Sequence, residues 1–193
     1  MRNMTMEQTN THSERVAVGC LSCYNEGRLT YKYLDAHQLD EAYESGNMAA
    51  YVCDQPRTIY HNPEEWHIQD YDGEMSRVSV HLGEWPDIPN LVQCMALFDD
   101  DPTMYVPAFL FATEFVDGTP TAEQVESIAE QMTWTHDVED YFREQAYDCG
   151  FITDGDHLAS YVDWEHYARD QMYGYYSMEY GEYTYLLGHG VSI

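Results

Sequence analysis

The sequence predicts an α+β protein, because strand-like patterns occupy both ends of the chain and helical patterns occupy its middle. Residues 16–21 form a short apolar run of the length and β-branched content of a buried strand. Residues 86–98 repeat apolar side chains every three or four positions, which is the period of an amphipathic helix. Residues 175–178 and 183–187 are rich in tyrosine and flank a glycine turn, as in a hairpin.

An N-terminal α+β domain is predicted over residues 15–73, after a polar tail of residues 1–14. Its three strands are expected at residues 16–21, 29–34 and 66–71, and the last is closed by a turn at residues 72–73. Asp35 is expected to cap a short helix over residues 36–44, which Gly46 follows. The strands and the helix together predict a small antiparallel sheet with one short helix.

A mainly helical central domain is predicted over residues 74–133. Its first helix is the amphipathic segment of residues 86–98. Residues 105–115 are apolar nearly all round, so they form either a buried helix or a buried strand, and we favour the helix. Pro102 separates these two segments, because proline interrupts a continuing helix.

A third central helix, over residues 122–132, carries acidic residues on one side. Thr121 and Gln124 match the capping box that starts a helix. The apolar residues of this segment fall at positions i, i+3, i+4 and i+7, so they form one buried stripe. The opposite face carries Glu123, Glu126 and Glu130.

The C-terminal α+β domain is predicted over residues 134–193, with a second acidic helix, a helix capped by Asp163 and the final hairpin. The second acidic helix has an apolar stripe that includes Tyr141 and Phe142. Four carboxylates follow the other side, spanning about 16 Å at 1.5 Å per residue: Asp137, Asp140, Glu144 and Asp148. Like charges at this spacing cost a few tenths of a kcal/mol per pair, so a whole row favours a functional explanation.

The charge of the chain excludes two classes of partner. The 193 residues include 35 Asp and Glu but 8 Lys and Arg, for a formal net charge of -27. Binding to nucleic acid or to anionic membranes requires a basic surface, so neither is expected. The charge is uneven, with a net of -3 in residues 1–57 and -24 in residues 58–193. A salt-adapted protein would spread its acids evenly, whereas this asymmetry is typical of an interaction surface.

The composition predicts a folded cytoplasmic protein rather than a disordered acidic chain. Hydrophobic residues make up 44% and aromatic residues 15%, whereas acidic disordered segments are poor in both. We find neither an apolar stretch of membrane-spanning length nor an export signal. The five cysteines are therefore expected to be reduced thiols.

Motifs for catalysis or cofactor binding are weak in this sequence. Cys20 and Cys23 form a C-x-x-C pair, and Cys53 and His61 are the nearby candidates for further zinc ligands, but structural thiols are the simpler interpretation. The usual phosphate-binding, zinc-protease and serine-hydrolase patterns are not found. We therefore predict a protein that is not an enzyme, with no catalytic, cofactor or metal site. A carboxylate-based hydrolase stays open, because paired carboxylates have no sequence signature.

The amount of negative charge matches that of a length of DNA. Duplex DNA carries one charge per roughly 1.7 Å of its axis, so a net charge of -27 corresponds to about 46 Å of duplex and a dimer to about 92 Å. Rows of carboxylates on helix faces would then take the place of phosphates. The alternative is that the same carboxylates are an ordinary solvated surface.

Three blocks of the sequence resemble the ArdA antirestriction proteins. They are residues 16–29 with the following Tyr33-Leu34-Asp35, residues 64–73, and residues 161–170. The resemblance implies an elongated homodimer with three small domains per chain, encoded on plasmids, transposons or phages. It also implies a DNA mimic that occupies the DNA groove of type I restriction–modification enzymes, protects incoming DNA, and often blocks methylation too.

We therefore predict a DNA-mimicking antirestriction protein whose partner is the methyltransferase core of a type I enzyme. The carboxylates expected to face Lys and Arg of that partner are Glu123, Glu126, Glu130, Asp137, Asp140, Glu144, Asp148, Asp163, Glu165 and Asp170. Any one of them alone is more simply a solvated residue or a helix cap, so the prediction concerns the set. The alternatives are an acidic protein that sequesters another basic DNA-binding or defence protein, and the hydrolase.

Overall fold

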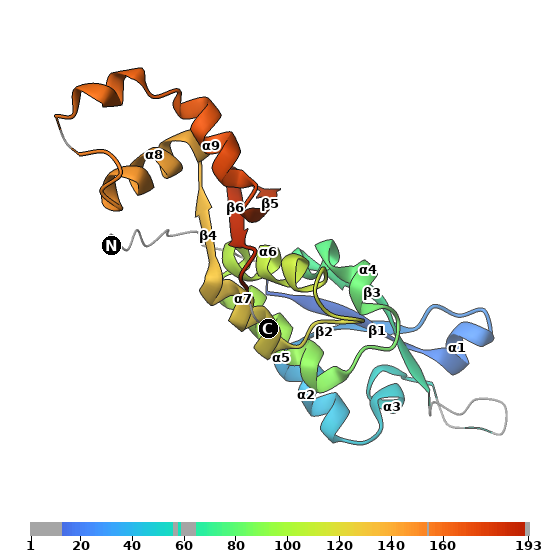
Figure 1. Cartoon of the computed structure of the whole chain (residues 1–193). Helices are drawn as coiled ribbons and strands as arrows, with labels where there is room; N and C mark the ends of the chain where they lie inside the picture. Colours follow the sequence, from blue (N-terminus) through green and yellow to red (C-terminus); the bar gives the residue numbers. More distant parts are fainter. Residues whose placement is uncertain (1–12, 56–57, 59–64, 154, 192–193) are drawn as a thin grey trace.

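The computed structural model describes residues 13–55, 58, 65–153 and 155–191. It confirms the predicted α+β class, with helices and two small antiparallel sheets. The molecule is elongated (Figure 1), with the N-terminal sheet at one end, a pair of C-terminal helices at the other, and the central helices and second sheet between them.

The N-terminal sheet has the strand order β2-β1-β3, and both pairs are antiparallel. It consists of β1 (Arg15–Cys20), β2 (Tyr31–Asp35) and β3 (Trp66–Asp72). Central strand β1 is buried from Val16 onward, which explains its almost uninterrupted apolar sequence. Helix α2 (Ala36–Glu44) begins as predicted, because Asp35 and Gln38 form a reciprocal capping box.

Several short helices of the first 82 residues were not predicted: α1 (Leu21–Asn25), α3 (Met48–Val52), the 3₁₀ helix η1 (Gly73–Arg77) and α4 (Ser79–Leu82). Leu21, which we assigned to the first strand, begins α1. Helices this short have little intrinsic stability and depend on tertiary packing. The packing is visible at Met48 and Met75, which are buried in the core.

The central region consists of α5 (Ile88–Asp100), α6 (Pro102–Ala112) and α7 (Ala122–Gln131). The predicted helix over residues 105–115 is confirmed, although it starts and ends three residues earlier. Pro102 stands in its first turn, where a missing N–H costs no hydrogen bond. The predicted capping box of Thr121 and Gln124 starts α7.

The second sheet has the order β4-β6-β5 and combines the predicted hairpin with a strand that we missed. The hairpin is β5 (Tyr175–Tyr180) and β6 (Tyr183–Gly188), and the missed strand is β4 (Met132–Thr135). We placed Met132 at the end of a helix, but it pairs with Leu187. Such a distant partner leaves no trace in the local pattern of the sequence.

Two helices and a 3₁₀ turn lie between β4 and β5: α8 (Val138–Asp148), η2 (His157–Tyr161) and α9 (Trp164–Met172). Helices α8 and α9 pack against each other at the end of the molecule opposite the N-terminal sheet (Figure 1). Asp163 caps α9 as predicted, by accepting a hydrogen bond from the backbone N–H of His166.

The apolar interior has two parts. A main cluster runs from the N-terminal sheet through α5, α6 and α7 to Tyr185 and Leu187 of the second sheet. A smaller cluster centres on Phe142 of α8, Ala168 of α9 and Leu186. The division into three domains at residues 73 and 133 stays a prediction. Among the described residues, no helix has both the length and the apolar character to cross a membrane.

Candidate partner-binding surface

All ten carboxylates that we assigned to partner binding belong to exposed residues. They fall into two groups (Figure 1): those of α7 lie in the central region, and those of α8 and α9 lie at the end of the molecule. The structure therefore distributes the ten over two acidic surfaces rather than along one line. We call these the α7 surface and the α8–α9 surface.

On α8 the acidic row lies opposite the buried side. Asp140, Glu144 and Asp148 are exposed, whereas Phe142 and Ala146 are buried. Their spacing of four residues corresponds to about 6 Å per step. The fourth predicted member, Asp137, instead caps the helix by accepting from the backbone N–H of Asp140 at 3.0 Å. Its carboxylate therefore lies at the start of the row, where the helix dipole also stabilises its negative charge.

On α9 two of the acids lie at the start of the helix and one lies in its last turn. Asp163 is the N-cap and Glu165 lies in the first turn, so both carboxylates are favoured by the helix dipole. Asp170 lies in the last turn of α9, with a carboxylate oxygen 3.4 Å from Nε2 of His166. The local roles of these three residues explain their presence without a partner, and their exposure leaves them available to one.

The α7 surface includes acids that we did not predict. Burial raises the pKa of Tyr105 on α6, and the negative charges of Asp100, Glu126, Asp101 and Glu130 raise it further. The end of α5 and the outer face of α7 therefore share one electrostatic neighbourhood. The run Asp99-Asp100-Asp101 was the available signal in the sequence, but its proximity to α7 depends on how α5, α6 and α7 pack.

The basic side chains of the described residues lie against acidic or histidine side chains of the same chain. The contacts are Arg15 with Asp72, Arg28 with Glu26, Lys32 with Asp54, Arg77 with Glu74, Arg143 with Glu139 and Asp140, and Arg169 with His166. Exposed pairs of this kind contribute about 0–1 kcal/mol each to stability. Their larger effect is electrostatic, because most of the positive charge lies beside acids of the same chain. On α8 this includes Asp140, a member of the acidic row, which pairs with Arg143.

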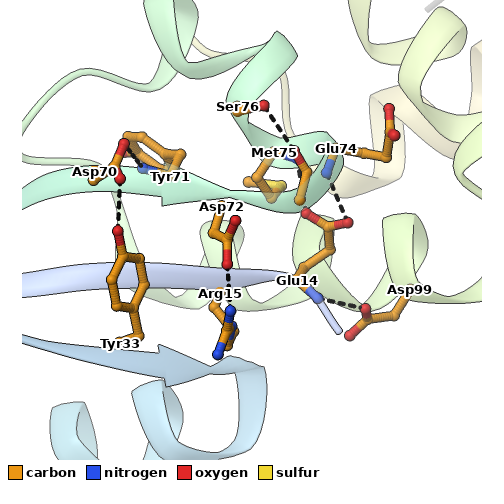
Figure 2. Close-up of polar contacts among 11 residues, drawn as sticks. Glu14, Arg15, Tyr33, Asp70, Tyr71, Asp72, Glu74, Met75, Ser76 and Asp99 are labelled. Atoms are coloured by element: carbon orange, nitrogen blue, oxygen red, sulfur yellow. Dashed lines mark hydrogen bonds and ion pairs between the residues drawn. The ribbon is translucent and has the colours of Figure 1, made fainter. Parts of the chain in front are cut away.

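The buried carboxylate of Glu14 is anchored in the fold rather than open to a substrate (Figure 2). Its two oxygens accept from the backbone N–H groups of Glu74 and Met75 at 3.0 and 2.7 Å. Its own backbone N–H donates to Asp99 at 2.7 Å. Gly73 keeps the space open, since a Cβ there would lie 2.7 Å from the carboxylate oxygens. We had placed Glu14 in a polar tail; residues 1–12 of that segment lie outside the described residues.

Burial raises the pKa of Glu14, although the two backbone hydrogen bonds act in the opposite direction. A raised carboxyl pKa is also a property of catalytic acids. Here the residue is completely buried and both oxygens are already hydrogen-bonded. Burial in the fold therefore accounts for the raised pKa of Glu14, and the arrangement gives the hydrolase alternative no support.

Three thiols are the described groups best placed to hold a metal ion. Cys20 lies at the end of β1, Cys23 in α1 and Cys53 just after α3, and their sulfur atoms all lie within 4.8 Å of one another. The sequence had placed the C-x-x-C pair before a turn, whereas α1 occupies that position. His61, the other candidate ligand, lies outside the described residues.

Comparison with known proteins identifies the family. Among curated proteins, none matches the chain significantly. The family model described as antirestriction protein (ArdA) matches residues 16–185, which run from β1 to the first half of β6 and include the helices α1 to α9. The chain belongs to the ArdA family of antirestriction proteins.

Proposed function

We propose that this protein is a DNA mimic that occupies the DNA-binding groove of type I restriction–modification enzymes and so protects incoming DNA from restriction. The observation that carries the proposal is the exposure of all ten predicted carboxylates on α7, α8 and α9. The groove that binds DNA must present Lys and Arg to phosphates. An acidic surface of matching density would compete for the same side chains.

The spacing of the carboxylates indicates how much acidic surface is needed to imitate DNA. A single strand of DNA has one phosphate per about 3.4 Å of axis, whereas the row on α8 has one carboxylate per about 6 Å. One helix row therefore replaces roughly every second phosphate of one strand. Further acids must contribute, and those of α7, of α9 and of the end of α5 are the candidates that we propose. A homodimer, which we also propose, would double the length covered.

The proposed role is binding rather than catalysis, and the proposed location is the cytoplasm, where restriction enzymes meet entering DNA. In this role each carboxylate contributes a part of the affinity, as phosphates do in DNA binding. Removal of one carboxylate should therefore weaken inhibition by a small factor, whereas an enzyme would lose its activity when one catalytic carboxylate is replaced.

The decisive experiment is competition for the methyltransferase core of a type I enzyme between this protein and a labelled duplex. The variant to compare is Asp140→Asn/Glu144→Gln/Asp148→Asn, which removes three charges from α8. Its matched control is Asp40→Asn/Glu41→Gln/Glu44→Gln, which removes three exposed charges from α2 at the other end of the molecule. We expect the α8 variant to bind about ten-fold more weakly, since exposed ion pairs contribute about 0.5 kcal/mol each.

The control should retain nearly the affinity of the unmodified protein, and the competition should weaken steeply with salt. Equal losses from both variants would mean that net charge alone matters and that α8 is not a specific contact. No displacement of duplex at micromolar protein would refute the type I target. Displacement of duplex from unrelated basic proteins with the same affinity would instead favour the sequestration alternative.

A further inference from the structure

The three clustered cysteines come from three separate elements and meet beneath the surface of the N-terminal sheet. Cys20 and Cys23 are fully buried, and Cys53 retains 8% exposure. The sulfur atoms of Cys23 and Cys53 are 3.6 Å apart, and those of all three residues lie within 4.8 Å of one another. Zinc bonds of 2.3 Å with tetrahedral angles place thiolate sulfurs about 3.8 Å apart. The Cys23–Cys53 distance is close to this value, and the sulfur of Cys20 lies within 4.8 Å of both.

The surroundings of the cluster also suit a cation held by three thiolates. Such a group with Zn²⁺ has a net charge of -1, and the guanidinium Nη2 of Arg28 lies 4.0 Å from the Cys23 sulfur. Thr30 hydrogen-bonds the Cys23 side chain and so helps to orient it. Cys53 is the least buried of the three residues, so a water molecule on that side would supply the fourth ligand.

The alternative is that the cysteines only fill the core, as Cys94 does on α5. Buried thiols behave as small hydrophobic side chains and are common in protein interiors. Cys94, however, has no second thiol in such a cluster among the described residues. Three elements converge on one point at Cys20, Cys23 and Cys53, and packing alone does not require sulfur at all three positions.

We propose that Cys20, Cys23 and Cys53 bind one Zn²⁺ ion, which ties α1 and the end of α3 to the end of β1. The site is structural, since its ligands lie in the interior of the N-terminal region and away from the α7 and α8–α9 surfaces. It is independent of the proposed antirestriction role, because the ion adds no charge to either acidic surface.

The test uses the full chain, purified under reducing conditions without chelator, and measures zinc per chain by plasma mass spectrometry. We expect about one ion per chain for the unmodified protein. Cys20→Ser, Cys23→Ser and Cys53→Ser should each lose most of the zinc. Cys94→Ala controls for loss of a buried thiol, and Cys149→Ser controls for loss of an exposed one; both should retain the ion.

Cobalt provides a measurement on the unmodified protein, which does not depend on whether the variants fold. Metal-free reduced protein titrated with Co²⁺ should develop a thiolate-to-cobalt charge-transfer band, and Zn²⁺ should remove it. Zinc should also raise the melting temperature, since an ion that binds only the folded chain stabilises it. Absence of both zinc and the cobalt band would overturn the proposal. So would zinc retained by any of the three serine variants, or a metal-free Cys23–Cys53 disulfide in the purified protein.

Discussion

The N-terminal sheet and the helix pair α8–α9 differ in how much side chain they bury. Strand β1 is buried at every position after Arg15, and its side chains join the main cluster. In α8 and α9 the buried residues are Phe142, Ala146 and Ala168. Hydrophobic stabilisation grows with the apolar area removed from water, so the α8–α9 end should be the less stable of the two.

The same two regions both expose large apolar residues. Near the N-terminal sheet Leu29 is 74% exposed, and around α8 and α9 Phe151 is 77%, Tyr161 82% and Tyr173 78% exposed. The comparison teaches that the two ends differ in how much side chain they bury, and not in whether they expose large apolar residues.

The largest expected effect comes from removing the central side chain of the smaller cluster. Phe142→Ala should destabilise the α8–α9 pair by about 3–5 kcal/mol, the usual cost of deleting a buried phenylalanine. Hydrogen exchange should show loss of protection in α8 and α9, with protection retained in β1. The matched variant Phe98→Ala, in the main cluster, should reduce protection in α5 and in the N-terminal sheet. Equal loss in β1 from both variants would show that the two regions are one cooperative unit.

A smaller effect is expected at the anchored carboxylate of the N-terminal region. Glu14→Gln retains one acceptor oxygen, so one backbone N–H of Glu74 or Met75 loses its partner, at a cost of about 1–3 kcal/mol. Urea unfolding of both proteins at neutral pH measures the difference. Ser76→Ala, which removes an exposed hydrogen bond to Gly73 in the same turn, should cost less.

The difference in unfolding free energy between the unmodified protein and Glu14→Gln depends on pH with a definite sign. Burial raises the pKa of Glu14 above its ordinary value of 4.5, so the folded protein holds this proton more tightly than the unfolded chain. The resulting stability is complete below pH 4.5 and is lost as pH rises through the folded pKa. The advantage of the unmodified protein over Glu14→Gln should therefore shrink over the interval in which the pH rises above 4.5. An advantage that grows over this interval would contradict the assignment.

The smallest expected effect comes from one carboxylate on α8, whose removal should change stability and binding in opposite directions. Glu144 lies four residues from both Asp140 and Asp148, so Glu144→Gln removes two repulsions and should raise stability by about 0.5 kcal/mol. The same change should weaken competition with duplex. Glu41→Gln on α2, beside His37 at 3.8 Å, should change both quantities less. If Glu144→Gln left both quantities unchanged, the α8 row would be an ordinary solvated surface.

The starts of the helices with a strong capping signal were predictable, because capping acts within a few residues. Asp35 with Gln38 and Thr121 with Gln124 form their capping boxes at the predicted positions. The exposed face of α8 was equally predictable, because the 3.6-residue period fixes which side chains lie opposite Phe142. Strand β4 was missed because it is a strand only through its pairing with β6, which lies some fifty residues further along the chain.

The sequence by itself determined the α+β class, the acidic balance and the residues that α7, α8 and α9 present to solvent. Those properties depend on composition and on contacts within one or two helical turns. Only the tertiary structure decided that Glu14 is buried against the start of η1, that Asp100 lies near the acids of α7, and that Cys53 meets the C-x-x-C pair. These are encounters between residues distant in sequence, and they are set by how separate elements pack, for which no local pattern exists.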